Sequence, residues 1–203
     1  EIAQCLVGSE MCIRDSYDVD TKISIPFAAP YQMMNMTLAY QAMRMLEPET
    51  GIKKEEILKG IRNTRWQGRM QEVGENIYFD GAHNVAGIHA FLDSVALIRP
   101  QNPILLFSMV SDKDYEKAIQ LLAERGQWEQ VIVTTISDKR GIPAEDIARI
   151  FSHFGQQAVV IEDSRKAYEW ALKGKKRGQA LFCTGSLYFI GELLEITGGK
   201  NSD

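Results

Sequence analysis

The residues best suited to chemistry in this sequence follow a short apolar strand pattern. An acid, a glycine, an imidazole and an amide come next, as Asp80, Gly81, His83 and Asn84. An amphipathic pattern starting near Val85 then predicts a helix. In an open parallel sheet, ligands bind at the carboxyl ends of the strands. Asp80 and His83 are therefore candidates to contact a ligand.

A purely structural interpretation accounts for the same residues. Strand-Asp-Gly-helix junctions are common in α/β proteins, so Asp80 could be an ordinary turn residue. Asn84 could be a helix N-cap and His83 a partly exposed loop histidine. The choice between the two interpretations depends on which residues the rest of the chain brings nearby.

Strand and helix patterns alternate regularly beyond residue 65. The expected strands are Met70 to Val73, Ile77 to Asp80, Ile104 to Met109, Val131 to Ile136, Ala158 to Ile161 and Ala180 to Thr184. The segments between them carry apolar residues at helical spacing, such as Ile88, Phe91, Leu92 and Val95. Short strands alternating with helices predict right-handed βαβ units and an α/β fold with a doubly wound, mostly parallel sheet.

In such a sheet, every strand-to-helix loop lies at the carboxyl edge, so the polar residues after the strands share one rim. These residues are Asp80, His83, Ser111 to Asp114, Ser137 to Arg140, Glu162 to Ser164 and Thr184 to Ser186. Some are expected to cap helices, with Ser164 and Ser186 as good N-caps and Asp112 or Asp114 as another. Gly185 is more informative, because a glycine directly after a strand lets a ligand approach a helix N-terminus, whose amides favour anions.

The beginning of the chain carries weaker patterns. Residues 1–16 show no sustained period and no start signal, and their core resembles a translated sequencing-adapter tag. We expect a non-native, poorly packed segment there. Residues 17–30 predict an extended chain that stops at Pro26 and Pro30.

A methionine-rich helix is expected from Gln32 to Leu46. Met34 and Leu38 fall on one face and Met36 on another, and we interpret the methionine stripe as core. Pro48 and Gly51 are expected to break the helix, since proline lacks the N–H that continues it.

A second, shorter helix is predicted over residues 54–61, followed by a polar, glycine-containing stretch that suits a hinge. We therefore expect a domain boundary near residue 65. Residues 17–65 would form the end of one domain, and residues 66–203 would form a second domain.

Composition sets outer limits on function. With 203 residues, the chain can bury one core, or one domain plus the remnant of another. Its 23 basic and 27 acidic residues give a net charge of -4, which argues against a broad nucleic-acid surface. No apolar run approaches the roughly 18 residues that a membrane span needs. Three cysteines without metal spacing favour a reducing cytoplasm, and we expect a monomer.

Several common cofactor motifs are missing. No Walker A sequence is present, since residues 198–201 imitate one without the preceding strand. No G-x-G-x-x-G follows a strand, so a dinucleotide site has no fingerprint. His89 and His153 fall on helices, where surface or packing roles are expected, and no zinc or other metal site is predicted within this sequence.

Three motifs carry a resemblance to a known family. They are Arg65 to Arg69, Tyr78 to Asn84 and Thr184 to Tyr188, with shorter matches at Tyr31 to Asn35 and Asp112 to Asp114. In this order and spacing, they resemble the carboxyl-terminal domain of folylpolyglutamate synthase, a Mur ligase relative. The resemblance implies a Rossmann-like domain preceded by a helical remnant of the central ATPase domain.

The resemblance also implies an activity. Members of this family are ATP-dependent ligases that add L-glutamate to the γ-carboxyl of a folate, and dihydrofolate synthesis is left open as a second activity. The acceptor carboxylate is phosphorylated, and the glutamate amine then attacks the acyl phosphate while Mg²⁺ balances phosphate charge. The implied ligands are therefore ATP, magnesium, folate and L-glutamate.

Site residues follow from the same motifs. By resemblance, Asn35, Arg69 and Asp80 would contact ATP, while His83 and Ser186 would hold the incoming glutamate. Asp80 and His83 are accordingly the candidate catalytic residues. A guanidinium and a carboxylate suit phosphate and ribose hydroxyls, and an imidazole and a hydroxyl at a helix start suit a free carboxylate.

The sequence departs from the family pattern at one residue in each of two turns, and it lacks a counterpart of the family's amino-terminal domain. Gln67 and Val85 stand where the family usually has proline, which loosens each turn without removing a ligand. The family's phosphate-binding loop, metal ligands and most of its folate surface belong to an amino-terminal domain that has no counterpart here. We therefore expect a fragment that does not turn over alone.

Two other functions fit the sequence. A non-catalytic nucleotide-binding module would use Asp80 to bind ATP and would ignore glutamate. A different Mur-type ligase would act on a cell-wall precursor instead of a folate.

Overall fold

The computed structural model describes residues 10–13, 21–24, 29–111 and 114–198. Contacts divide the chain into two compact units, Glu1–Trp66 and Gln67–Asp203, which we call the amino-terminal and carboxyl-terminal units. In the part of the chain that the structure describes, no helix has the length and apolar character needed to cross a membrane.

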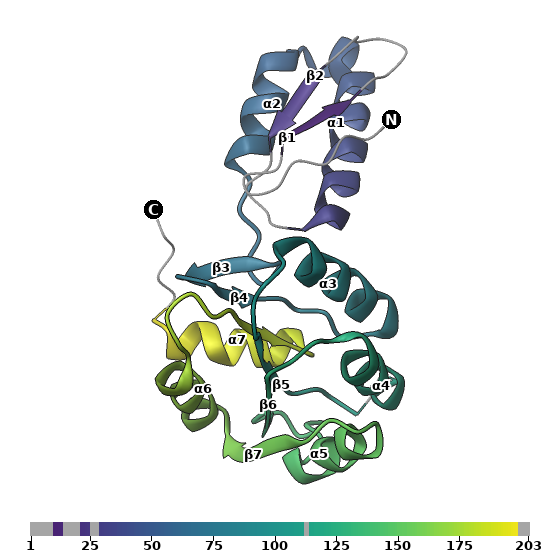
Figure 1. Cartoon of the computed structure of the whole chain (residues 1–203). Helices are drawn as coiled ribbons and strands as arrows, with labels where there is room; N and C mark the ends of the chain where they lie inside the picture. The colour runs from purple at the N-terminus through teal and green to yellow at the C-terminus, as the bar shows by residue number, and fades with distance from the viewer. Residues whose placement is uncertain (1–9, 14–20, 25–28, 112–113, 199–203) are drawn as a thin grey trace. The chain divides into compact units, whose positions relative to one another are not determined.

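The amino-terminal unit combines two strands with two helices (Figure 1). They are β1 (Glu10–Ile13), β2 (Thr21–Ser24), α1 (Pro30–Thr50) and α2 (Lys54–Asn63). Strands β1 and β2 pair antiparallel, although no pattern predicted a strand at β1. The helices bury a small cluster of Met36, Tyr40, Ile57 and Ile61.

Two expectations for α1 were wrong. The helix continues through Pro48 and ends at Gly51, whose left-handed backbone (φ 71°) lets its N–H donate to the Glu47 carbonyl. Pro48 lies in the last turn, where a missing N–H removes a single helical bond. Met36 is core as expected, but Met34 and Leu38 are 56% and 63% exposed.

The carboxyl-terminal unit holds a six-stranded sheet in the order β3-β4-β8-β5-β6-β7. The strands are β3 (Gln71–Gly74), β4 (Ile77–Phe79), β5 (Ile104–Phe107), β6 (Gln130–Thr135), β7 (Ala158–Asp163) and β8 (Leu181–Thr184). All adjacent pairs are parallel except β3 with β4. The predicted doubly wound, mostly parallel α/β sheet is confirmed, with an antiparallel strand at one edge.

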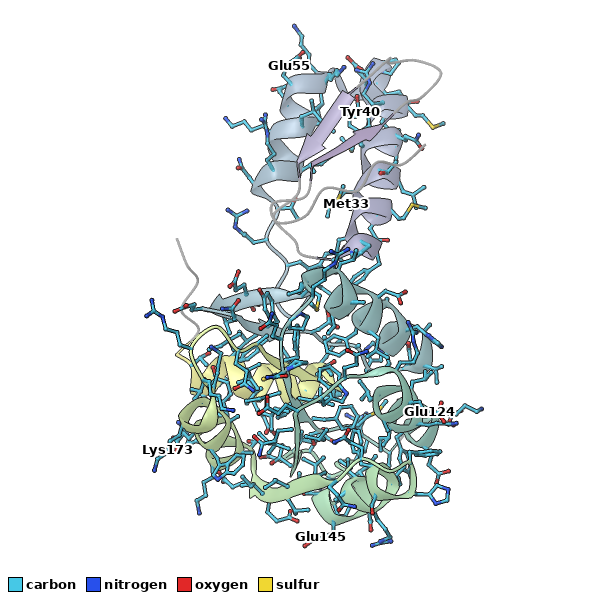
Figure 2. All side chains as sticks on the ribbon, in the orientation of Figure 1. Met33, Tyr40, Glu55, Glu124, Glu145 and Lys173 are labelled. Atoms are coloured by element: carbon cyan, nitrogen blue, oxygen red, sulfur yellow. The ribbon has the colours of Figure 1, made fainter. Side chains whose placement is uncertain are left out.

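Helices cover both faces of this sheet (Figure 1). They are α3 (Val85–Ile98), α4 (Tyr115–Arg125), α5 (Ala144–His153), α6 (Ser164–Gly174) and α7 (Leu187–Ile196). Helices α3, α4 and α5 lie on one face, and α6 and α7 lie on the other. Figure 2 shows Glu124, Glu145 and Lys173 pointing outward from α4, α5 and α6, as expected for amphipathic helices.

The two faces bury different residues of the same strands. On the α3 face, the Phe182 ring packs against Tyr78, Phe91 and Trp128, with ring centroids 5.1 to 6.1 Å apart. On the α6 and α7 face, Phe79 meets the edge of the Tyr168 ring at 5.8 Å. Successive side chains of a strand point to opposite faces, so the central strands are buried on both sides. This double burial fixes the edge where the strands end.

The junction between β8 and α7 offers a sharp test of this packing. Gly185 has φ 119°, and a Cβ there would collide with the Ser108 carbonyl oxygen and the Phe107 ring. Gly191, within α7, has no atom within 4 Å of such a Cβ. We predict that Gly185→Ala lowers the unfolding free energy by about 2–4 kcal/mol, while Gly191→Ala leaves it unchanged or raises it by up to about 1 kcal/mol. Urea unfolding followed by circular dichroism would measure both, and equal effects would contradict the packing.

Candidate functional site

The carboxyl edge of the sheet is one continuous hydrogen-bonded rim. The Asp80 amide donates to the Cys183 carbonyl at 3.0 Å, joining the ends of β4 and β8. The Ser108 amide donates to the Thr184 carbonyl at 3.3 Å, which joins β8 to β5. Beyond β5, the Ser111 amide donates to the Arg140 carbonyl at 2.8 Å. The loops that follow four strands are therefore held side by side.

This rim contains a switch in chain direction. The chain leaves β4 and β5 toward α3 and α4 on one face, whereas it leaves β8, which lies between them, toward α7 on the other. Loops that diverge from neighbouring parallel strands open a crevice, and open α/β sheets bind ligands at this position. The predicted rim residues after β4 and β8 lie at this switch point.

The buried carboxylate of Asp80 joins two loops of the rim, and we call its contacts with the Met70 and Ala82 amides the Asp80 brace. Asp80 is only 2% exposed, and its Oδ2 and Oδ1 accept hydrogen bonds from the Met70 and Ala82 amides, each at 2.9 Å. The carboxylate thus joins the turn before β3 to the loop that carries His83. These two contacts agree with the turn interpretation of Asp80, and they hold the residue at the carboxyl edge of the sheet.

Arg69 lies in the turn that Asp80 holds. Its neighbours Gly68 and Met70 have left-handed backbones, with φ 66° and 44°. The Gly68 carbonyl accepts from the Gly81 amide at 2.7 Å, and the Met70 side chain is buried. A non-glycine residue with positive φ costs of order 1 kcal/mol or more, so it persists only where surrounding contacts fix it. Arg69, half-buried, is therefore presented by a rigid turn.

His83 is half-buried and oriented by its own loop. Its Nδ1 lies 2.9 Å from the Gly81 carbonyl oxygen. Because a carbonyl can only accept, Nδ1 carries the proton, and in the neutral ring Nε2 is the acceptor. Nε2 can then accept from an ammonium group, or donate to a carboxylate when the ring is protonated. Asn84 caps α3 through Oδ1, which accepts from the Gly87 amide at 2.7 Å.

Ser186 lies across the switch point from Asp80. It is 1% exposed, and its Oγ accepts from the Tyr188 amide at 3.2 Å, so it caps α7 as expected. Gly185 brings the backbone against the end of β5, next to the Ser108 carbonyl oxygen and the Phe107 ring. A hydroxyl and the first amides of a helix form a setting that favours an anion.

Two buried hydroxyls at this rim lack partners. Among the described residues, Ser108 Oγ and Thr184 Oγ1 are fully buried and make no hydrogen bond. A buried hydroxyl without a partner costs about 1–3 kcal/mol, so a hydrogen bond to either hydroxyl would be stabilising. Both lie at the ends of β5 and β8, beside Gly185.

The loop after β6 adds a fixed cation that the sequence did not single out. Arg140 Nε and Nη2 donate to Asp138 Oδ1 and Oδ2 at 2.9 and 3.1 Å. Its guanidinium carbon lies 4.6 Å from the centroid of the Tyr188 ring, in the first turn of α7. The short Asp-x-Arg spacing is visible in the sequence, but the distant tyrosine that stacks on the arginine is not.

The expected cap at Ser164 was wrong, and of the alternatives Asp112 and Asp114 only Asp114 lies in the described residues. Asp163, rather than Ser164, caps α6, since its Oδ1 accepts from the Lys166 amide at 2.8 Å. Asp114 occupies the N-cap position of α4, but its side chain pairs with Lys117 at 2.8 Å instead of capping. A charged partner one turn away competes with the backbone for the carboxylate. The predicted Asp112 and Lys113 lie outside the described residues.

Arg69, Asp80, His83 and Ser186 thus lie on loops of the same rim, whereas Asn35 belongs to the other unit. Asn35 lies in the second turn of α1, where its side-chain amide donates to Gln32 Oε1 at 3.1 Å. Within the described ranges, no group of three or more His, Cys, Asp or Glu side chains could hold a metal ion. Cys183 is fully buried, and burial raises the pKa of its thiol well above the usual value, which suits a core residue.

Comparison with known proteins identifies the domain. Residues 68–187, more than half of the chain, match the family described as "Mur ligase, glutamate ligase domain". The chain belongs to the Mur ligase family. The matched range contains every rim residue discussed above except Tyr188. The resemblance predicted from the motifs is confirmed.

Curated proteins that are similar to this chain include a folylpolyglutamate synthase and a probable dihydrofolate synthetase. The chain is 24% identical over 195 residues to a folylpolyglutamate synthase from Lacticaseibacillus casei, covering 91% of this chain and 43% of that protein. It is 25% identical over 184 residues to a probable dihydrofolate synthetase from Schizosaccharomyces pombe, covering 84% and 43%. The chain therefore spans less than half the length of these relatives.

Solved structures share the fold. The Mycobacterium tuberculosis folylpolyglutamate synthase complexed with ADP and AMPPCP superposes with a TM-score of 0.80 at 19% identity. The match covers 100% of this chain and 48% of that chain. Escherichia coli FolC in complex with DHPP and ADP gives a TM-score of 0.80 at 18% identity, covering 98% and 45%.

The brace formed by Asp80 predicts a stability effect in this Mur ligase domain. Asp80→Ala leaves two buried amides without an acceptor, so we expect the unfolding free energy to fall by about 2–4 kcal/mol. Asp146→Ala is the matched control, because it removes an exposed ion pair with Arg149 and should cost less than about 1 kcal/mol. Urea unfolding would compare them, and a neutral Asp80→Ala would show that the brace is not structural.

The Asp138–Arg140 pair predicts a titration. Hydrogen bonds from the Arg140 side chain and backbone lower the Asp138 pKa from 3.8 to about 2. Because the folded pKa is the lower one, the ionised carboxylate stabilises the loop above the unfolded pKa, and this contribution is lost as the pH falls toward about 2. An NMR titration of the Asp138 carboxyl carbon should show this midpoint, and Arg140→Gln should return it toward 3.8. An unchanged midpoint in the variant would contradict the pairing.

Proposed function

We propose that this chain is the carboxyl-terminal portion of an ATP-dependent folylpolyglutamate synthase. The enzyme would join L-glutamate to the γ-carboxyl of a folate through an acyl phosphate. The observation that carries the proposal is the arrangement of Arg69, Asp80, His83 and Ser186 at one switch point, within a domain matched to glutamate ligases. The names of the curated relatives support the folate substrate.

The nucleotide would contact the side of the rim formed by the turn before β3. The guanidinium of Arg69 suits phosphate oxygens, and a carboxylate such as Asp80 suits a ribose hydroxyl. The nucleotide contact of Asp80 would be made in addition to the two backbone amides that its carboxylate accepts.

The glutamate would occupy the start of α7. Ser186 and the first amides of the helix suit its α-carboxylate. His83, with Nε2 as acceptor, suits its amine and would take a proton from the nitrogen, which would attack the carbonyl carbon of the acyl phosphate as phosphate leaves. Asp80 would act on this step indirectly, because it fixes the loop that presents His83.

Magnesium would balance the phosphate charge when bound. The described residues offer no cluster of metal ligands, so its ligands are proposed to lie in the part of the enzyme that supplies the phosphate-binding loop. Since those metal ligands and the phosphate-binding loop would come from another part of the enzyme, we propose that the chain is inactive alone. A cytoplasmic location and a monomeric state also remain predictions.

The first test of this function is turnover. We expect the 203-residue chain to release no ADP in the presence of ATP, Mg²⁺, a folate and L-glutamate. Release that depends on both folate and glutamate would contradict the proposed division of the enzyme.

The second test is binding, measured by ¹H–¹⁵N NMR titration of the chain. L-glutamate should shift the amides of Gly185, Ser186 and His83, and Ser186→Ala should weaken binding about fivefold or more. Asp163→Ala, which removes the cap of α6, is the matched control for lost helix capping and should bind normally. A response to ATP without any response to glutamate would favour a nucleotide-binding module instead.

A further inference from the structure

The loop from Ser137 to Arg140 is held against α7 at both ends. Tyr188 and Glu192 lie one helical turn apart, so they share a face of α7. The Tyr188 ring stacks on the Arg140 guanidinium, and Glu192 Oε1 accepts from the Ser137 amide at 2.6 Å. The loop is therefore positioned by the same helix whose first turn forms the proposed glutamate site.

The Arg140 side chain is fixed in orientation. Asp138 contacts one edge of the guanidinium through both carboxylate oxygens, while the Tyr188 ring lies against its face. The Arg140 carbonyl also accepts from the Ser111 amide, which ties the loop to β5. A long side chain that is already ordered loses less entropy when it binds a ligand. A guanidinium has five N–H donors and can engage more than one carboxylate.

The surroundings of Arg140 remain open to solvent. Its side chain is 42% exposed, and Leu187 and Tyr188 in the first turn of α7 are 47% and 51% exposed. Lys139 adds a second positive charge to the loop. The rim thus presents two positively polarised groups near each other, namely the N-terminus of α7 and a fixed guanidinium. The unpartnered hydroxyls of Ser108 and Thr184 lie at the same edge.

We propose that Arg140 is a specificity residue for the incoming amino acid and binds its side-chain carboxylate. The start of α7 with Ser186 would take the α-carboxylate, so the two ends of a dicarboxylic amino acid would be recognised separately. Tyr188 and Glu192 would be positioning residues that act through the loop. This inference rests on the proposed function, because it assumes that glutamate binds at α7.

The test compares L-glutamate with L-glutamine, which differ in the charge of the side-chain end. In ¹H–¹⁵N NMR titrations of the full chain, the unmodified protein should prefer glutamate by about tenfold or more. Arg140→Gln should reduce that preference to within about twofold by weakening glutamate binding alone. Arg149→Gln is the matched control, because it removes an exposed arginine paired with Asp146 on α5 and should keep the full preference.

The outcomes separate the two proposals. If Arg140→Gln retains the preference while Ser186→Ala weakens both amino acids, the role of Arg140 is wrong and the glutamate site stands. If the unmodified chain binds ATP but neither amino acid, both the glutamate site and the role of Arg140 are wrong. Should Arg140→Gln disturb the spectrum of the whole unit, Arg140→Lys keeps the charge but loses the two-point contact, and it should give an intermediate preference. An unchanged preference in that variant would also overturn the proposal.

Discussion

The buried carboxylate of Asp80 is the contact on which the carboxyl edge of this sheet depends. It accepts the Met70 amide on one side and the Ala82 amide on the other, and both donors are buried. Without this acceptor, the turn before β3 and the loop after β4 would each leave an unsatisfied amide in the interior. The left-handed backbone at Met70 is tolerated because the same contact holds it.

The brace has consequences for the neighbouring helix. With the Gly68 turn fixed to Gly81, both glycines lie against α7, where a Cβ would contact Ile190 or collide with Leu187. The start of α7 is therefore set by the loops after β4 as well as by β8. The positions of Ser186, Tyr188 and Arg140 then follow from how α7 packs. One buried carboxylate thus connects the proposed nucleotide side of the rim with its proposed amino-acid side.

Much of the fold could be predicted from the pattern of apolar residues. Strands β4 to β8 correspond to short apolar runs bounded by polar or turn residues, and the buried residues Ile88, Phe91 and Ile147 on the helices follow a spacing of 3.6 residues. The parts that were missed depend on tertiary contacts. The pairing of β1 with β2 depends on which strand lies beside β1. The exposure of Met34 depends on which residues pack against its face of α1. The local spacing of residues contains neither piece of information.

The candidate site was likewise predictable where local pattern decides it and not where tertiary contacts do. The polar residues after each strand could be assigned to one rim because parallel strands end at the same edge. The sequence did not reveal that Asp80 is a brace, because its partners are backbone amides. Nor did it reveal that Arg140 stacks on Tyr188, since a loop and a helix distant in sequence meet there. Family motifs identified the residues, while geometry separated their structural roles from the roles proposed in binding.

We propose that the rim held together by Asp80 receives the amino-acid substrate of this Mur ligase domain. A crystal structure of the chain grown with L-glutamate tests it most directly. We expect glutamate at the start of α7, between Ser186, His83 and Arg140. The Asp80 carboxylate should still accept hydrogen bonds from the Met70 and Ala82 amides. Glutamate bound away from this rim, or an Asp80 side chain turned away from both amides, would contradict it.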